Sequence, residues 1–366
     1  MPPNSVTGLQ GRQPVRAFDL AAGLAVFFMI LVHVLWHWGE PATWSTPIGL
    51  AISFAAGPTA APVFAFLMGA SVGAAPRTSF LTLALRGLWL VFLGYVLNLS
   101  RGVIPASIGL ATGFITQPQI APFTPWWLAT TVDLHQMVGL SLVVIAGLRS
   151  WLKPGWTWVL LAVIVGALSP WLRTVTFGTP LLDAPLTPFL GSAPNVYYAV
   201  VPWVAFPLVG AVFGSMIVSS TDIRRLFRRA AVLGFGLIAV GIAMIAVQQP
   251  SFDVYTYWRQ PWSFMVAIFG VILAWLAACD LVTRVPAIDR RLSIIYGWSD
   301  RVIAMYFSHW IIVGWGVAIV GFRDLALVPV LVAITGVVIL TNYASKLAVR
   351  LESSPWFQRA PSEFGP

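Results

Sequence analysis

The feature that most constrains this chain is a series of about ten apolar segments, which follow one another with short gaps between residues 17 and 347. Each segment is close to the roughly 20 residues that a helix needs to cross about 30 Å of hydrocarbon. Strands cross a membrane only as a closed barrel with alternating polarity, and these segments do not alternate, so all are predicted to be helices. The predicted spans are 17–38, 47–75, 79–99, 130–148, 155–172, 196–218, 230–248, 262–282, 300–320 and 325–347.

The overall composition agrees with a chain surrounded by lipid. Of the 366 residues, 58% are hydrophobic and 9% are charged, whereas soluble domains carry roughly 25% charged residues. The net charge of +9 lies mostly between the apolar segments, as membrane topology requires, so it gives little support to nucleic-acid binding. The single cysteine, Cys279, excludes a disulfide framework within the chain. These features predict an all-α, polytopic membrane helix bundle.

Basic residues alternate between the two sides of the predicted bundle. Lys and Arg are concentrated in the N-terminal arm, in every second connection and in the tail. The positive-inside rule therefore places both termini on the cytoplasmic side, and we expect the membrane to be the plasma membrane of a bacterium. We divide the chain into a flexible arm at 1–15, a transmembrane domain at 16–348 and a cytoplasmic tail at 349–366. The connections on the opposite side hold few basic residues, which are Arg101, Arg173, Arg259 and Arg323.

Proline and glycine modify the predicted helices. Segment 47–75 is long and contains Gly57, Pro58 and Pro62, which predict a kink or a short interfacial piece before the true span. Two pairs of glycines have the small-xxx-small spacing that lets membrane helices approach closely. These pairs are Gly69 with Gly73 and Gly210 with Gly214.

Two connections on the outer side, 100–129 and 173–195, are long and rich in Pro, Gly and Thr. The first carries the pair Trp126 and Trp127. Tryptophan at such places usually anchors a protein at the membrane interface. Loops of this length also cap binding sites in other proteins, so contact with a substrate is the second interpretation.

Ionisable residues inside a membrane are costly, so each one is a candidate functional group. His33 and His135 are each predicted to lie roughly 7 Å below the outer interface, while His309 is near the middle of its helix. His37 follows His33 by one turn on the same face, and Asp133 comes just before His135. One interpretation is that these groups only hold helices together. The other is a layer of acid–base groups that is reachable from outside.

A second polar layer is predicted near the inner surface. It contains Arg16 and Asp19 at the start of the first helix, Arg86 in the third, and Asp300 and Arg301 at the start of the ninth. These residues are either helix caps and positive-inside charges or a site for phosphate, which arginine binds well. Arg86 is embedded in an apolar stretch, so we expect it to need a partner such as Asp19 or a bound anion. Together the two layers suit transfer of a group from a cytoplasmic phosphate-bearing donor to an outside acceptor.

Other chemistries find little support in the sequence. The histidines are far apart along the chain and no acidic cluster accompanies them, so no metal site is predicted. No Walker or GxGxxG pattern occurs between a strand and a helix.

Five segments resemble, in the same order, segments of the transmembrane acyltransferase superfamily, and especially its branch of heparan-alpha-glucosaminide N-acetyltransferases and their bacterial relatives. Where the opening motif of that family has Arg before Gly, this chain has Ala22 before Gly23. The segments are RAFDLAAGLAVFFMILVH (16–33), APVFAFLMGASVG (61–73), DLHQMVGLSLVV (133–144), PWVAFPLVGAVFG (202–214) and SDRVIAMYFSHWII (299–312).

The resemblance implies an enzyme that moves an acetyl or other acyl group from cytoplasmic acyl-CoA to a saccharide or lipid-linked glycan on the outer face. Acyl-CoA would be a substrate, with no permanently bound cofactor. The expected general base or acyl carrier is His33, with His37 as its rival, while Asp133, His135 and His309 would orient groups or stabilise an oxyanion. The donor would be held by Arg16, Asp19, Arg86 and Arg301, and the acceptor would meet Trp126, Trp127, Tyr197 or Tyr198.

Two other classes of function remain open from the sequence. One is a transporter or flippase for a lipid-linked or anionic solute, in which the histidines would relay protons. The other is a non-catalytic subunit of a complex that builds the cell envelope. Membrane lipid is an expected partner in each case, a homo-oligomer is possible, and nucleic acid is not expected.

Overall fold

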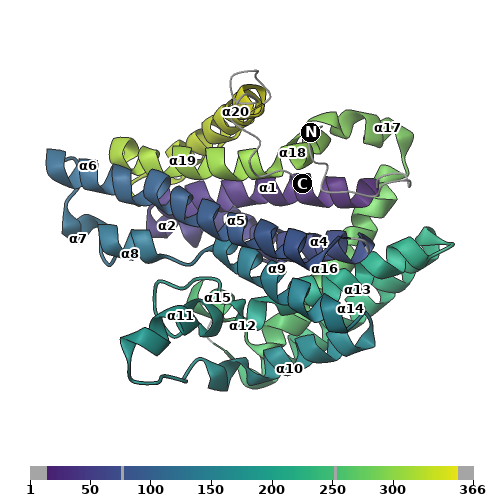
Figure 1. The fold of residues 1–366 in the computed structure, drawn as a ribbon. Coiled ribbons are helices and arrows are strands. Elements are labelled where there is room, and N and C mark those ends of the chain that lie inside the picture. Colours follow the sequence, from purple (N-terminus) through teal and green to yellow (C-terminus); the bar gives the residue numbers. More distant parts are fainter. Residues whose placement is uncertain (1–14, 76–77, 251–253, 353–366) are drawn as a thin grey trace.

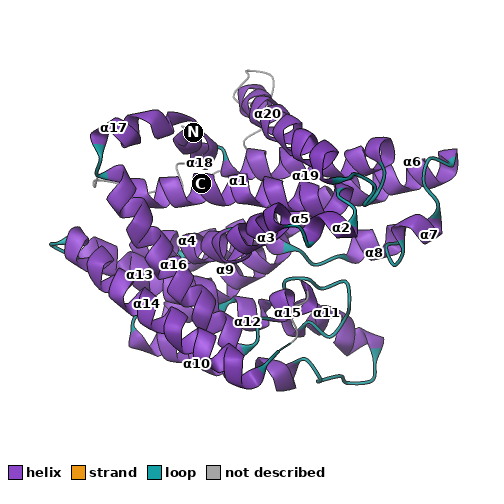
Figure 2. Cartoon of the chain, turned by 180° about the vertical axis from the view of Figure 1, so that it is seen from behind, coloured by secondary structure: helices purple, strands orange, loops and turns teal. Residues whose placement is uncertain are grey.

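The computed structural model describes residues 15–75, 78–250 and 254–352, and within them the chain consists of helices and loops without extended strands (Figure 2). The predicted arm lies almost wholly outside the described residues, as does the tail from residue 353. Eight helical spans are long and apolar enough to cross a membrane: Arg16–Trp38, Pro47–Ala74, Phe80–Thr112, Val200–Ser219, Ile223–Gln248, Trp262–Thr283, Val302–Val320 and Leu327–Glu352. The other two predicted segments form α9 (Leu134–Trp151) and α10 (Trp156–Leu172).

The described helices also include short ones that connect the spans. The first half of the chain forms α1 (Arg16–Trp38), α2 (Pro41–Trp44), α3 (Pro47–Thr59), α4 (Ala61–Ala74), α5 (Phe80–Asn98), α6 (Ile104–Thr112), α7 (Gln117–Ile120) and α8 (Pro125–Thr130). After α9 and α10 come α11 (Pro180–Leu190), α12 (Val200–Trp203), α13 (Ala205–Ser219), α14 (Ile223–Gln248), α15 (Val254–Arg259), α16 (Trp262–Thr283), α17 (Pro286–Asp289), α18 (Ser293–Asp300), α19 (Val302–Val320) and α20 (Leu327–Glu352).

Helix α1 is the central helix of the bundle (Figure 1). It packs against α3, α4, α16, α18, α19 and α20. Ala21, Ala25, Val26 and Ile30 are completely buried, because small and branched apolar side chains let several neighbours approach one helix closely. His33 and His37, near the end of α1, are half-buried.

The predicted kink in segment 47–75 is confirmed. The chain breaks at Ala60, whose φ of −93° and ψ of −95° are not helical, and α4 then begins with Pro62 in its first turn. Proline at the start of a helix costs little because the N–H that it lacks has no helical partner there. The break places the end of α3 and the start of α4 beside the C-terminal half of α1.

Both glycine pairs lie where α4 and α13 approach closely, and their spacing predicted such an approach. A Cβ atom placed on Gly69 would lie 2.0 Å from the Pro207 carbonyl oxygen, and one on Gly214 would lie 1.9 Å from that of Ala70. Helices α4 and α13 are thus in backbone contact, which only glycine permits at these positions.

The outer connection 100–129 differs from the predicted loop. Helix α5 continues through a π-helical turn at Leu99–Val103 into α6, and the helix ends only at Gly113, whose φ is +76°. The π turn accommodates Pro105, whose missing N–H would otherwise break the helix. The continuous helix projects at one end of the molecule, and α7 and α8 return beneath it (Figure 1).

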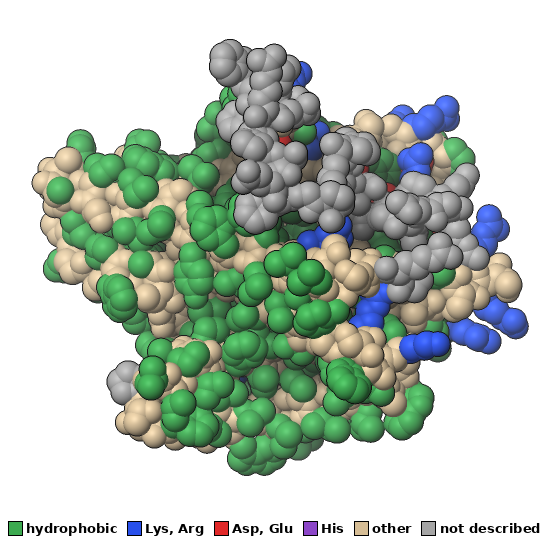
Figure 3. Space-filling model, in the orientation of Figure 1, with side chains coloured by type: hydrophobic (Ala, Val, Ile, Leu, Met, Phe, Trp, Pro, Cys, Tyr) green, Lys and Arg blue, Asp and Glu red, His purple; other side chains and the backbone are tan. Residues whose placement is uncertain are grey.

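Smaller differences concern the predicted boundaries. The second outer connection, 173–195, contains α11, and the last helix runs to Glu352, past the predicted domain end at 348. Basic side chains gather toward the end of the molecule where α13, α14 and α17 lie, opposite the projecting α6 (Figure 3). The prediction that this end is cytoplasmic rests on that distribution of charge.

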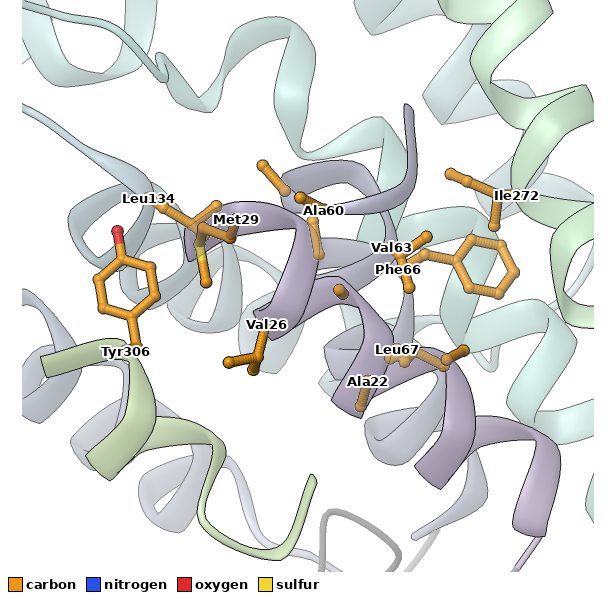
Figure 4. Close-up of a cluster of buried hydrophobic side chains, with 14 of the residues drawn as sticks. Ala22, Val26, Met29, Ala60, Val63, Phe66, Leu67, Leu134, Ile272 and Tyr306 are labelled. Carbon is orange, nitrogen blue, oxygen red and sulfur yellow. The ribbon is translucent and has the colours of Figure 1, made fainter. Parts of the chain in front are cut away.

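A tightly packed apolar layer fills the middle of the bundle (Figure 4). Ala22, Val26 and Met29 of α1 are almost completely buried. They meet side chains from the α3–α4 break, α9, α16 and α19, namely Ala60, Val63, Phe66, Leu67, Leu134, Ile272 and Tyr306. This layer separates the N-terminal end of α1 from its histidine-bearing C-terminal half.

Candidate active site

Two histidines from opposite ends of the sequence are in direct contact. The Nδ1 atom of His33 in α1 lies 3.0 Å from Nε2 of His309 in α19. The two rings are nearly parallel, with 5.3 Å between their centroids. The pair lies inside the bundle, and the side chain of His309 is completely buried.

The hydrogen bonds of His309 fix the protonation of both rings. Its Nδ1 lies 3.1 Å from the carbonyl oxygen of Met305, which can only accept, so Nδ1 carries the proton. No negatively charged group contacts His309 among the described residues, so the buried ring is assigned as neutral. Its Nε2 then accepts the Nδ1 proton of His33. This leaves the Nε2 lone pair of His33 free to accept a proton or to attack an acyl carbon.

His37 sits beside the pair in the same protonation state. Its Nδ1 lies 2.9 Å from the backbone oxygen of His33 and therefore donates to it. The His33 and His37 rings meet edge to face at 6.2 Å, and both contact the indole of Trp310, at 4.0 and 5.2 Å. His37 thus offers a second imidazole with a free Nε2, one turn nearer the outer end of α1.

A buried ion pair lies on the other side of Trp310. Arg101, in the π-helical turn after α5, stacks on the Trp310 ring with 3.9 Å between its guanidinium carbon and the ring centroid. The same guanidinium binds the carboxylate of Asp133, and the side chains of both residues are 10% exposed. Arg101 also donates a longer hydrogen bond, 3.4 Å, to Asn98. The Trp310 indole therefore contacts both the Arg101 guanidinium and the His33 ring.

Asp133 is fixed in place by the start of α9. One carboxylate oxygen accepts from the Leu134 N–H at 2.8 Å, and the Gln136 side chain accepts from the Asp133 N–H at 3.1 Å. This capping box satisfies the N–H groups that a helix start leaves unpaired. The second carboxylate oxygen remains for Arg101.

His135 is turned away from the His33 and His309 pair. Its ring packs against Tyr306 at 4.2 Å and Phe307 at 5.2 Å, and its Nδ1 is buried without a hydrogen-bond partner. Tyr306 in turn meets the His309 ring edge to face at 5.3 Å. His135 is therefore connected to the pair through Tyr306 and forms no hydrogen bond with the neighbouring Asp133.

A narrow pocket of about 30 Å³ opens beside His33. Its polar lining comes from His33, Asp133, Tyr198, Tyr257 and Tyr306, and the α3–α4 break supplies an apolar wall. A space of this size holds about two water molecules. A larger reactant would need the surrounding helices to move apart.

The predicted inner residues lie at the other end of α1. Arg16 forms an ion pair of 3.0 Å with Asp289 and lies over the ring of Tyr296. The Tyr296 hydroxyl donates to the same carboxylate, and burial together with that negative charge raises the pKa of Tyr296 to about 12. Asp19 lies close enough to Arg16 to interact electrostatically.

Arg301 and Arg86 differ in their surroundings. Arg301 donates to the Asn342 side chain at 3.3 Å, while its Nε is buried without a partner. Arg86 is exposed on α5, and no hydrogen bond or ion pair joins it to another described residue. The structure therefore brings Arg16 and Asp19 together and leaves Arg86 away from them.

The residues predicted to meet an acceptor are only partly grouped. Trp127 donates from its indole N–H to the Tyr197 hydroxyl at 3.3 Å, whereas Trp126 is 77% exposed. Tyr198 lines the pocket beside His33.

The sequence did not single out four members of the site, namely Arg101, Tyr257, Tyr306 and Trp310. Arg101 was counted as an outer-loop charge, although the scarcity of basic residues on that side was a signal that it has a specific role. Trp310 and Tyr306 flank His309 within an apolar helix, where aromatic residues usually indicate packing. Among the described residues, no three His, Cys, Asp or Glu side chains form a group that could hold a metal ion.

The part of the chain that matches a known family contains several residues of this site. Residues 15–241 match the family described as heparan-alpha-glucosaminide N-acetyltransferase, catalytic. The match takes in His33, Arg101 and Asp133, while His309 lies beyond its end. No curated protein matches the chain. Because the match spans more than half of the sequence, the chain belongs to the family of heparan-alpha-glucosaminide N-acetyltransferase catalytic domains, as an integral membrane protein.

Proposed function

We propose that this protein transfers an acetyl or related acyl group from cytoplasmic acyl-CoA to an amine or hydroxyl of a saccharide or lipid-linked glycan on the outer face. The observation that carries the proposal is the contact between His33 and His309, which leaves the His33 Nε2 lone pair free beside a pocket. Family membership supports acyl transfer as the reaction class.

In the simplest course, the acceptor amine or hydroxyl attacks the thioester carbonyl carbon. His33 Nε2 takes the proton of the attacking group, the new C–N or C–O bond forms, and the C–S bond breaks. The CoA thiolate then receives the proton from His33 and leaves as the thiol. His309 holds His33 through Nδ1, so it disperses the positive charge that His33 acquires.

A mechanism with a covalent intermediate is the alternative. His33 Nε2 attacks the thioester carbon directly, the CoA thiolate leaves, and the acyl group stays on the imidazole. The acceptor then attacks the acyl-imidazole, and a second base takes its proton. His37 suits that role because it has its own free Nε2 and lies one turn nearer the outer end.

Acetyl transfer by purified protein in lipid nanodiscs tests the proposal. Radiolabelled acetyl-CoA and glucosamine are supplied, and labelled product is separated from donor. His33→Gln keeps the size of the side chain but removes the base, and it should lower the rate by roughly 10²–10⁴ fold. The variant should elute from a sizing column at the wild-type position.

The other functional classes give different outcomes in the same system. Uptake of a labelled solute into sealed vesicles without acyl transfer would indicate a transporter. Absence of both activities, together with a harmless His33→Gln substitution in the cell, would indicate a non-catalytic subunit. Either result would overturn the acyltransferase proposal.

A further inference from the structure

A second cavity of about 220 Å³ lies at the end of the bundle near α11 and α15. Its lining contains Arg173, Arg259 and three aromatic side chains, and no Asp or Glu is among its lining residues. The aromatic residues are Tyr197, Tyr255 and Trp258, with the Tyr197 and Trp258 rings 4.3 Å apart. The cavity is larger than the pocket beside His33.

The two arginines of this cavity have no acidic partner among the described residues. Arg173 follows α10 and donates from one terminal nitrogen to the Arg259 backbone oxygen at 2.6 Å, which brings the two residues together. Its Nε is buried and unpartnered. Burial and the charge of Arg259 lower the pKa of Arg173 to about 10. Since no described carboxylate offsets the repulsion between these two neighbouring cations, a bound dianion would relieve it.

The location of these arginines is also unusual. Arg173 and Arg259 lie on the predicted outer side, where basic residues are rare in membrane proteins. The other two arginines of that side have partners, because Arg101 binds Asp133 and Arg323 stacks on Trp44 at 4.7 Å. Arg173 and Arg259, by contrast, both line the 220 Å³ cavity.

One stretch of chain separates the cavity from the His33 pocket. Tyr197 lines the cavity and Tyr198 lines the pocket, and the N–H groups of both residues approach the Val132 carbonyl oxygen, at 3.0 and 3.4 Å. Val132 directly precedes Asp133, which also lines the pocket. A molecule held in the cavity is therefore adjacent to the candidate reaction centre.

We infer that this cavity binds a phosphate group carried by the acceptor saccharide, with the guanidinium groups of Arg173 and Arg259 on the phosphate and the Tyr197, Tyr255 and Trp258 rings against the sugar. This inference rests on the proposed function for the identity of the bound molecule as acceptor. Arginine forks match phosphate oxygens in geometry, and aromatic rings give the apolar faces of a sugar a flat surface to pack against.

Binding without any acyl donor tests the inference separately from the reaction. Isothermal titration calorimetry compares glucosamine 1-phosphate with glucosamine on protein in nanodiscs of zwitterionic lipid. The phosphate ester should bind at least about tenfold more tightly, since charge-assisted hydrogen bonds contribute roughly 1.5–3 kcal/mol. Arg173→Gln and Arg259→Gln should each remove about tenfold of that preference and leave glucosamine binding unchanged.

Two controls keep the test decisive. Lys153→Gln removes an exposed positive charge from the connection between α9 and α10, and it should change neither affinity. Arg259 is exposed and its guanidinium lies over the Tyr255 ring without an ion pair to any described residue, so its variant should fold even where Arg173→Gln does not. Equal binding of the two sugars to the wild type, or an Arg259→Gln variant with wild-type preference, would overturn the inference.

The same titration distinguishes the source of the phosphate. If the site takes a lipid-borne phosphate, nanodiscs with phosphatidylglycerol will weaken binding of glucosamine 1-phosphate to the wild type but not to Arg259→Gln. If the site takes a water-soluble ester, the lipid will have no effect. The titration contains no acetyl-CoA, so it measures sugar binding alone. A failure to detect acetyl transfer in the earlier assay would therefore not change the outcome of the titration.

Discussion

Replacing Asp133 by Asn should destabilise the protein strongly, because it leaves Arg101 as an unpaired buried cation. Both side chains of the ion pair are 10% exposed, and removing one partner of a buried pair costs about 3–5 kcal/mol. Asn is also a good helix N-cap, so the roughly 1 kcal/mol of the capping interaction is retained. The measured loss should therefore report the ion pair alone, at about 3 kcal/mol.

Replacing the other partner, in Arg101→Gln, should lower the free energy of unfolding by less, because the unpaired charge that remains is better stabilised. The Asp133 carboxylate still accepts the hydrogen bond from the Leu134 N–H. It also remains at the N-terminus of α9, where the helix dipole stabilises a negative charge. This variant also loses the stacking on Trp310, which is worth about 1 kcal/mol. A total near 2–3 kcal/mol is expected.

The double variant separates the ion pair from its surroundings. Arg101→Gln with Asp133→Asn leaves no buried charge, so its loss should be smaller than the sum of the single losses by about 2–3 kcal/mol. Unfolding by SDS in mixed micelles, followed by circular dichroism, measures all four proteins. Additive losses, or an Asp133→Asn variant within about 1 kcal/mol of wild type, would refute the reasoning.

Two further predictions concern the helix contact and the histidine pair. Gly69→Ala and Gly214→Ala should each destabilise the protein by about 1–3 kcal/mol in the same unfolding assay, because the new Cβ would meet a backbone oxygen. Gly236→Ala, which meets nothing within 4 Å, is the matched control and should be neutral or slightly stabilising. His309→Gln should lower kcat for acetyl transfer by roughly 10–100 fold, shift its pH profile and leave KM nearly unchanged, because His309 acts through His33. A changed KM with an unchanged pH profile would contradict that role.

The sequence was sufficient for the helical character of the predicted segments and for the way two of them pack, although among the described residues eight spans, and not ten, are long and apolar enough to cross a membrane. Length and apolar character predict a helix because backbone hydrogen bonds in lipid must be made within the segment. The kink near Pro58 and Pro62 and the close contact through Gly69 and Gly214 depend on local chemistry, so they could also be predicted.

The sequence was not sufficient for the position of Arg101. Gly102 and Pro105 indicate a loop locally, but the helix continues there because α19 packs against it. A Cβ on Gly314 would lie 1.9 Å from the Arg101 carbonyl oxygen, and the Trp315 indole donates to the Ser100 carbonyl oxygen at 3.0 Å. Those contacts join residues more than 200 positions apart, which no local pattern records.

The rotation of each helix about its axis could not be predicted from the sequence either. His33, His135 and His309 were placed by depth alone, and depth does not determine which rings face each other. The structure joins His33 to His309 directly and turns His135 toward Tyr306 and Phe307. Asp133 precedes His135 by two residues, yet its side chain binds Arg101.

The substitution of Ala22 for the arginine of the family motif has a structural consequence for the donor. Ala22 is 2% exposed within the apolar layer, and a Cβ on neighbouring Gly23 would lie 2.3 Å from the Ile295 carbonyl oxygen, so a guanidinium has no room here. From Asp19 to His33, α1 rises about 21 Å through that layer. In the proposed reaction, the phosphates of the acyl-CoA donor would therefore stay at the helix ends, where the Nε of Arg301 is a buried donor without a partner among the described residues. For the proposed donor, a thioester-bearing arm would have to cross this layer to reach His33, which requires the closely packed side chains around Val26 and Met29 to separate.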